Sequence, residues 1–173
     1  MKKLIIALAA LMVTAAAYGQ GQVVFNNRVG TEVVARVLLP DGTGAGAGFT
    51  AQLLGGPAGS TVDKLTALTP TTTFRTTSAA AQGYVNDPGP VTVPGVAAGA
   101  QATLVMRAFN GADYASSLIR GQSLPITVGL GGGTLPPANL TGLQGFTLEI
   151  IPEPSTIALG VLGAAVLLFR RRK

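Results

Sequence analysis

The stretch QATLVMRAF at residues 101–109 decides the fold, because its side chains alternate with the two-residue period of a β-strand. A strand places successive side chains on opposite faces of a sheet. One face would carry Thr103, Val105, Arg107 and Phe109, and the other Leu104, Met106 and Ala108. The stretch therefore predicts a strand.

Shorter runs on either side of it carry the same signal. They are QVVFNNR at 22–28, EVVARVLL at 32–39, FTAQLL at 49–54, LPITV at 124–128 and FTLEII at 146–151. Turn-forming residues separate them, at Asp41-Gly42, Gly55-Gly56-Pro57, Asp87-Pro88-Gly89-Pro90 and Gly131-Gly132-Gly133. Short strands between such turns predict an all-β, sandwich-like domain over residues 20–151.

One or two short helices are expected within this domain. Asp113 is followed by YASSLIR and then by Gly121, which is the order of an N-cap, a helical segment and a C-terminal glycine. Asp63, followed by KLTAL, predicts a second turn of helix.

The positive charge of the chain lies at its two ends. The 173 residues carry 12 Lys and Arg against 7 Asp and Glu, a net charge of +5. Residues 20–151 hold six basic and six acidic side chains, so this region is neutral. Nucleic-acid binding needs a basic patch on the folded body, and we therefore expect no nucleic-acid partner.

Two residue types are missing from the whole sequence. The chain has no cysteine, which excludes a disulfide, a thiolate metal site and a cysteine nucleophile. It also has no histidine, the commonest general base and the commonest transition-metal ligand. We therefore expect no enzyme activity, no metal and no cofactor.

Residues 1–19, MKKLIIALAALMVTAAAYG, have the pattern of a secretory signal peptide. Two lysines precede an apolar segment, and small residues follow it. Cleavage between Gly19 and Gln20 would put Ala17 at the −3 position, and cleavage after Ala17 is the alternative. Signal peptidase and the secretion machinery are the expected partners of this segment.

The C-terminus, IPEPSTIALGVLGAAVLLFRRRK, holds a charge-free apolar run of thirteen residues at 157–169. A helix of that length covers about 20 Å, against a hydrocarbon core of about 30 Å. A helix over 155–169 is therefore a marginal membrane anchor. The basic end resists translocation and keeps the domain on the outer side. It consists of Arg170, Arg171, Arg172 and Lys173.

The motif Pro152-Glu153-Pro154, the apolar helix and the terminal basic cluster together resemble the PEP-CTERM sorting signal, over residues 152–173. The resemblance implies recognition by an exosortase, a membrane-embedded thiol transpeptidase. It also implies an exported protein of the cell envelope or extracellular space, held transiently in the membrane by its C-terminal helix. The alternative is an ordinary C-terminal anchor.

Three other patterns are weaker. GTGAGA at 42–47 matches a loose dinucleotide-binding motif, but a strand-like run follows it where that motif needs a helix, so we expect a loop. Four aspartates could offer oxygens to calcium, yet each lies at a turn or cap, and we expect no metal site. The threonine-rich run at 69–73 favours an edge strand over an O-glycosylation site. The four aspartates are Asp41, Asp63, Asp87 and Asp113.

These observations predict a non-catalytic envelope or extracellular-matrix protein. The alternative is a secreted carbohydrate-binding module displayed at the surface, with extracellular polysaccharide as its partner. Such modules stack sugar rings on exposed aromatic side chains. We expect the core to need most aromatic residues of the domain, which are Phe25, Phe49, Phe74, Tyr84, Phe109, Tyr114 and Phe146.

Overall fold

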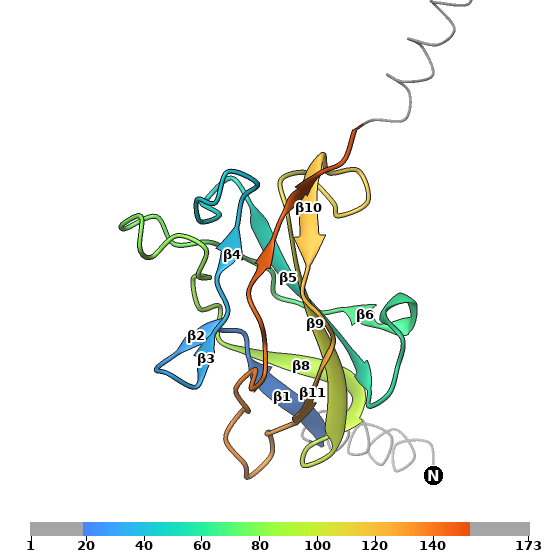
Figure 1. Cartoon of the computed structure of the whole chain (residues 1–173). Helices are drawn as coiled ribbons and strands as arrows, with labels where there is room; N and C mark the ends of the chain where they lie inside the picture. The colour runs from blue at the N-terminus through green and yellow to red at the C-terminus, as the bar shows by residue number, and fades with distance from the viewer. Residues whose placement is uncertain (1–18, 153–173) are drawn as a thin grey trace, which may run out of the picture.

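The computed structural model describes residues 19–152, and its centre is a pair of long antiparallel strands (Figure 1). Strand β9 (Gln101–Phe109) pairs with β5 (Thr50–Pro57) without interruption, from Thr50 opposite Phe109 to Pro57 opposite Ala102. The strand predicted from the alternation at 101–109 is therefore confirmed.

These two strands belong to a seven-stranded sheet in the order β13-β10-β9-β5-β6, with β11 also paired to β9 and β7 to β5. The added strands are short. They are β6 (Thr66–Ala67), β7 (Thr72–Thr73), β10 (Ile119–Gln122), β11 (Ile126–Gly129) and β13 (Glu149–Ile150).

Three two-stranded ribbons complete the strands, and the all-β prediction is confirmed. The strand predicted at 22–28 ends at residue 24. The strands predicted at 32–39 and 146–151 are each divided in two. The ribbons pair β1 (Gln20–Val24) with β8 (Pro90–Ala97), β2 (Arg28–Val29) with β3 (Val33–Val34), and β4 (Val37–Leu38) with β12 (Phe146–Thr147).

The core lies between the large sheet and the β1–β8 ribbon, which crosses it in Figure 1. Leu104 and Met106 of β9 are fully buried there, together with Val93 of β8. The approach is close: a side chain on Gly55 of β5 would come within about 3 Å of both Leu104 and Val93. The opposite face of β9 is also covered, because Val105 is fully buried.

Strand β8 was not expected from the sequence, because proline and glycine interrupt it. Pro94 is exposed and lies where the pairing with β1 shifts register, between Gln20 opposite Ala97 and Gly21 opposite Val93. A proline has no N–H to donate, and a bulge in a two-stranded ribbon is a place where none is needed.

The helix predicted from Asp113 to Gly121 is wrong. Asp113 does accept the backbone N–H of Ser116, at 2.9 Å, but only a turn follows. Ile119 and Arg120 pair instead with Ile150 and Glu149 as strand β10. The sheet offers these residues backbone partners on two sides, which outweighs their weak local helix preference. The second expected turn is confirmed as a 3₁₀ helix, η1 (Val62–Lys64).

Both predicted membrane-associated segments lie outside the described residues. This holds for Ala17 of the signal peptide and for Glu153, Pro154 and the basic end at 170–173. Within residues 19–152, no helix is long and apolar enough to cross a membrane.

One contact bears on the cleavage alternatives. The carbonyl of Gly19 accepts the N–H of Ala98 at 2.9 Å, next to the start of β1. Cleavage after Ala17 keeps this bond in the mature protein, whereas cleavage before Gln20 removes it. The cleavage position itself stays a prediction.

Candidate functional site

The last hydrogen-bonded residue of the described body directly precedes the predicted sorting motif. Strand β13 is paired with β10, and the N–H of the next residue, Ile151, donates to the carbonyl of Leu118 at 2.7 Å. Pro152 follows directly and is exposed. Figure 1 shows the chain leaving the body here, beside the start of β10. The motif therefore begins without any intervening linker.

A polar cleft of about 330 Å³ lies next to this exit, with Ile151 in its wall. Its aromatic member is the half-buried Tyr114, whose ring lies edge-on to Phe109 at 6.0 Å between centroids. The guanidinium carbons of Arg107 and Arg120 lie 4.9 and 5.3 Å from the centre of the Tyr114 ring. We call these four residues the Tyr114 cluster.

Each arginine of this cluster makes two hydrogen bonds to protein acceptors. Arg107 donates from Nε and Nη2 to the side-chain oxygen of Gln52, at 3.0 and 2.6 Å. Arg120 donates from Nη1 to the carbonyls of Tyr114 and Ala115. The cluster thus fastens the 113–117 turn onto the sheet.

Burial sets the electrostatics of the Tyr114 cluster. It lowers the pKa of Arg107, an effect that the charges of Tyr114 and Asp113 partly oppose. It raises the pKa of the Tyr114 phenol, against the influence of Arg120 and Arg107. The phenol therefore stays protonated at neutral pH.

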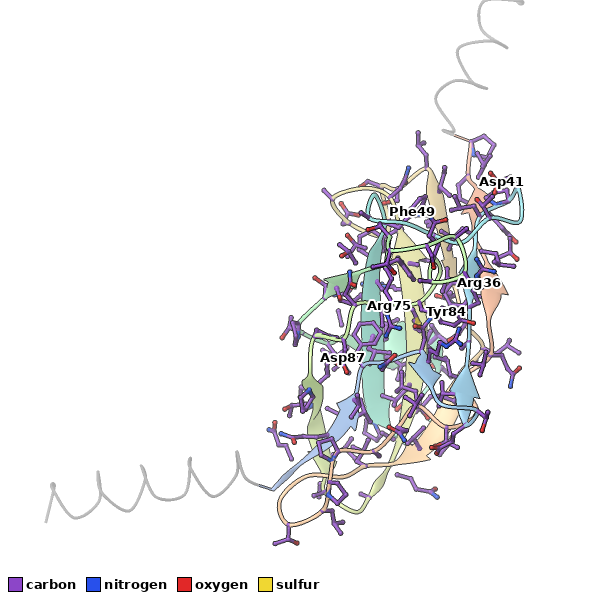
Figure 2. The ribbon with its side chains drawn as sticks, turned by 90° about the vertical axis from the view of Figure 1, so that its left-hand side faces the viewer. Arg36, Asp41, Phe49, Arg75, Tyr84 and Asp87 are labelled. Atoms are coloured by element: carbon purple, nitrogen blue, oxygen red, sulfur yellow. The ribbon has the colours of Figure 1, made fainter. Side chains whose placement is uncertain are left out.

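A second cleft of about 360 Å³ is built around Tyr84, on the face shown in Figure 2, where Arg75 and Tyr84 lie side by side. The guanidinium of Arg28 lies 4.8 Å from the centre of the Tyr84 ring. Arg75 donates from Nε to the carbonyl of Val85 at 2.9 Å, and Ser78 contributes the third polar group of the lining. We call this the Tyr84 cleft.

A buried amide positions this cleft. Asn27 is completely buried, and its Nδ2 donates to the carbonyls of Ala35 and Gly83 at 2.6 and 2.9 Å. Its Oδ1 accepts the N–H of Val85 at 2.9 Å. One side chain therefore joins the segment that carries Arg28 to the segment that carries Tyr84.

Arg36 supports the wall of the Tyr84 cleft. It donates from Nε to the carbonyl of Gln82 and from Nη2 to that of Ala79, at 2.8 and 2.6 Å. The chain then passes through Gly83, whose φ of 86° is in the left-handed region. A Cβ at Gly83 would lie 2.5 Å from the carbonyl oxygen of Val37, so only glycine fits there.

The glycine-rich segment at 42–47 forms a loop, as the sequence predicts. No helix follows it, and the next element is β5. Gly44 is required for packing, because a Cβ there would lie 2.4 Å from the backbone of Gln82. The expected strand in the threonine-rich run is also present, as β7, which pairs with β5.

The four aspartates are dispersed, and three of them accept hydrogen bonds within local turns. Asp41 accepts from Thr43, Asp87 from the N–H of Gly89, and Asp113 from Ser116. The fourth, Asp63, lies in the first turn of η1. The hydroxyl of Thr43 chiefly lowers the pKa of Asp41, and the backbone N–H of Ser116 chiefly lowers that of Asp113. In the described part of the chain, no group of three His, Cys, Asp or Glu residues could hold a metal ion.

The aromatic side chains of the body form no exposed stacking surface in the part that the structure describes. Four are buried, which are Phe25, Phe74, Tyr84 and Phe109. Three are half-buried, which are Phe49, Tyr114 and Phe146. Arginines lie over the rings of both tyrosines.

Sequence reasoning overlooked Asn27 and the arginines beside it. A signal was present in QVVFNNR, because Val23, Phe25 and Asn27 share one face of an extended chain. All three are completely buried. A polar residue that continues the buried face of a strand predicts a hydrogen-bonded buried amide.

Comparison with known proteins identifies the tail. The family model of the PEP-CTERM protein-sorting motif matches residues 151–173. No curated protein and no solved structure is significantly similar to the chain. The chain therefore carries a PEP-CTERM sorting motif, which confirms the resemblance seen in the sequence.

Proposed function

We propose that this chain is a non-catalytic protein of the cell envelope or extracellular matrix, delivered through its C-terminal motif. The match at residues 151–173 carries the proposal, since a PEP-CTERM motif marks an exported protein that an exosortase processes. The neutral body at 20–151 is then the exported domain, and the tail is the signal that directs its sorting.

The geometry at the junction between the body and the tail supports these separate roles. Ile151 is still hydrogen-bonded to the body, whereas Pro152 is exposed and has no N–H to donate to a helix or a sheet. A processing enzyme that recognises the motif would therefore act directly next to a folded domain. The last anchored residue fixes where the tail begins.

Composition supports the non-catalytic part of the proposal, because the chain has neither histidine nor cysteine. The carbohydrate-binding alternative has less support. Guanidinium groups lie over the rings of Tyr84 and Tyr114, where a sugar would have to stack.

The test is mass spectrometry of the C-terminus of the protein made in its native host. Glu153 is the acidic group of the motif, so Glu153→Ala should leave membrane insertion unchanged and prevent removal of the tail. Glu149→Ala is the matched control, because Glu149 is an exposed glutamate that belongs to strand β13 of the body. That variant should be processed normally.

A second variant tests the basic end. Replacing Arg170, Arg171 and Arg172 by Ser removes the charges that resist translocation. The tail should then pass through the membrane, and unprocessed protein should be released.

Processing of Glu153→Ala at the normal rate would contradict the sorting role and favour an ordinary anchor.

A further inference from the structure

The Tyr84 cleft presents hydrogen-bond donors that its own contacts leave free. The carbonyl of Val85 accepts from Nε of Arg75 alone, so that bond does not use the donors on the two Nη atoms. The guanidinium carbon of Arg28 lies 4.8 Å from the centre of the Tyr84 ring, and the hydrogen bonds within residues 19–152 include none from the Arg28 side chain to a protein acceptor. Planar guanidinium donors of this kind bind oxyanions in a bidentate manner.

The hydroxyl of Ser78 adds a third donor. Its oxygen accepts the N–H of Ala81 at 3.2 Å, which leaves the hydroxyl hydrogen available to a ligand. Ser78 lines the same cleft as Arg28 and Arg75. Three donors therefore surround one open space.

The groups around this space are held in place before any ligand arrives. Asn27 fixes the segment that precedes Arg28, and Tyr84 supports the guanidinium from below. Arg36 holds the loop that carries Ser78 through its bonds to Ala79 and Gln82. Such pre-organisation reduces the entropy lost when a ligand binds.

Charge in this cleft is unbalanced, although the body as a whole is neutral. None of the described residues that line the cleft is acidic, and two are arginines. The nearest acidic residue in sequence to Tyr84 is Asp87, which accepts the N–H of Gly89 in its own turn. A cleft lined by one sign of charge attracts ligands of the other sign.

From these observations we propose that the Tyr84 cleft binds an oxyanion, a carboxylate or phosphate group, through Arg28, Arg75 and Ser78. Its volume of about 360 Å³ suits one such group and its immediate neighbours. The cleft is open to solvent, so the group can belong to a larger molecule that continues beyond the protein surface. The site does not depend on the sorting role of the tail.

Isothermal titration calorimetry of the full chain in a non-ionic detergent tests this proposal. The probes are inorganic phosphate, trigalacturonate as a carboxylated sugar, and maltotriose as a neutral sugar of the same length. At least one anionic probe should bind saturably, and maltotriose should not bind. Which anion binds more tightly distinguishes the phosphate source from the carboxylate source.

Arg28→Gln should weaken binding about tenfold, since a charge-assisted bidentate contact is lost. Arg28 is exposed, and circular dichroism melting checks that this variant is folded. Lys64→Gln is the matched control, because it removes one exposed positive charge outside the cleft and should bind as the wild type does. A second measurement needs no variant: the Nε–Hε resonance of Arg75 should shift during titration of the wild type.

Several results would overturn the proposal. They are equal binding of maltotriose, no binding of either anion at millimolar concentration, unchanged binding by Arg28→Gln, or equal weakening by Lys64→Gln. An Arg75 resonance that does not move on addition of a bound anion would also place the anion elsewhere.

Discussion

The Tyr84 cleft and the Tyr114 cluster contain the same types of side chain, arginine and tyrosine, but their arginines differ in the hydrogen bonds that they make. Each places arginine guanidinium groups over a tyrosine ring. At Tyr114 each arginine makes two hydrogen bonds to protein acceptors, Arg107 to Gln52 and Arg120 to backbone carbonyls, so these side chains hold a turn against the sheet. At Tyr84 most of the donors are left free by these contacts. What an arginine does is therefore decided by the acceptors around it.

The largest expected effect comes from removing the amide that builds the Tyr84 cleft. Asn27→Ala leaves two buried groups without partners: the carbonyl of Ala35 loses its donor, and the N–H of Val85 loses its acceptor. The carbonyl of Gly83 also loses a donor but keeps the N–H of Val37. Each unsatisfied buried group costs about 1–3 kcal/mol, so the free energy of unfolding should fall by roughly 4 kcal/mol. Denaturant unfolding of the full chain, followed by circular dichroism, measures it.

The neighbouring Asn26→Ala provides the control. The side chain of Asn26 accepts only the N–H of Arg28, at 3.0 Å and near the surface. Its loss should cost less than about 1 kcal/mol. Equal costs for the two variants would mean that the buried amide does not organise this region.

The next largest effect concerns the left-handed residue behind the cleft. Gly83→Ala combines backbone strain at φ 86° with a Cβ only 2.5 Å from the carbonyl oxygen of Val37. We expect a loss of about 3 kcal/mol. Gly89→Ala, at φ 90° but with nothing within 4 Å, should lose only about 1 kcal/mol. Thermal unfolding of the two variants separates crowding from strain, and a reversed order would refute this packing.

The comparison between the clusters is tested most directly by one substitution in each. Arg120→Gln removes the bonds to the carbonyls of Tyr114 and Ala115 as well as the ring contact, and should cost about 1.5 kcal/mol. Arg28→Gln removes only an exposed ring contact and should cost about 0.5 kcal/mol. Chemical denaturation provides both values. A larger loss for Arg28→Gln would show that its role is structural, and the contrast would fail.

The smallest effect is a titration beside the Tyr114 cluster. The pKa of Asp113 is lowered first by the backbone N–H of Ser116 and then by its hydroxyl, so Ser116→Ala should raise it only part of the way. The pKa of Asp41 is lowered first by the hydroxyl of Thr43, so Thr43→Ala should raise it further. Carbon-detected NMR titration of the two carboxyl groups measures both shifts, and the opposite order would contradict this assignment.

The sign of the accompanying pH dependence follows from the direction of these shifts. A carboxyl group with a lowered pKa in the folded state stabilises the fold above its unfolded pKa, about 3.9. That contribution is lost as the pH falls through the lower, folded pKa. The two alanine variants should therefore differ from the wild type at neutral pH and approach it in acid.

Alternation predicted the central strands well, because a strand buried within a sheet carries its pattern in its own side chains. The prediction for residues 101–109 agrees with β9, and the run at 49–54 lies in β5. The turn predicted at Gly55-Gly56-Pro57 is wrong, because β5 continues through these residues and pairs with β9. Local sequence signals gave a wrong prediction where pairing with a distant backbone segment determines the secondary structure. Ile119 and Arg120 have helix-compatible neighbours but belong to β10, because Glu149 and Ile150 lie beside them in the sheet.

The tail and the Tyr84 cleft differ in the same respect. The sorting motif could be found in the sequence because it is a contiguous peptide, recognised by the order of its parts at 151–173. The cleft could not be found, since Arg28, Arg75 and Ser78 come from segments that no local rule brings together.

The sequence by itself therefore determined the β character of the body, the exported topology that we expect, and the motif at the C-terminus. Each depends on neighbouring residues or on composition. Only the tertiary structure decided that Asn27 joins distant segments. It also decided that Arg107 and Arg120 each make two hydrogen bonds to protein acceptors, whereas Arg75 makes one. The physical reason is that a buried polar group needs a hydrogen-bond partner close to it in space. That partner can lie far away in the sequence, where no local pattern indicates it.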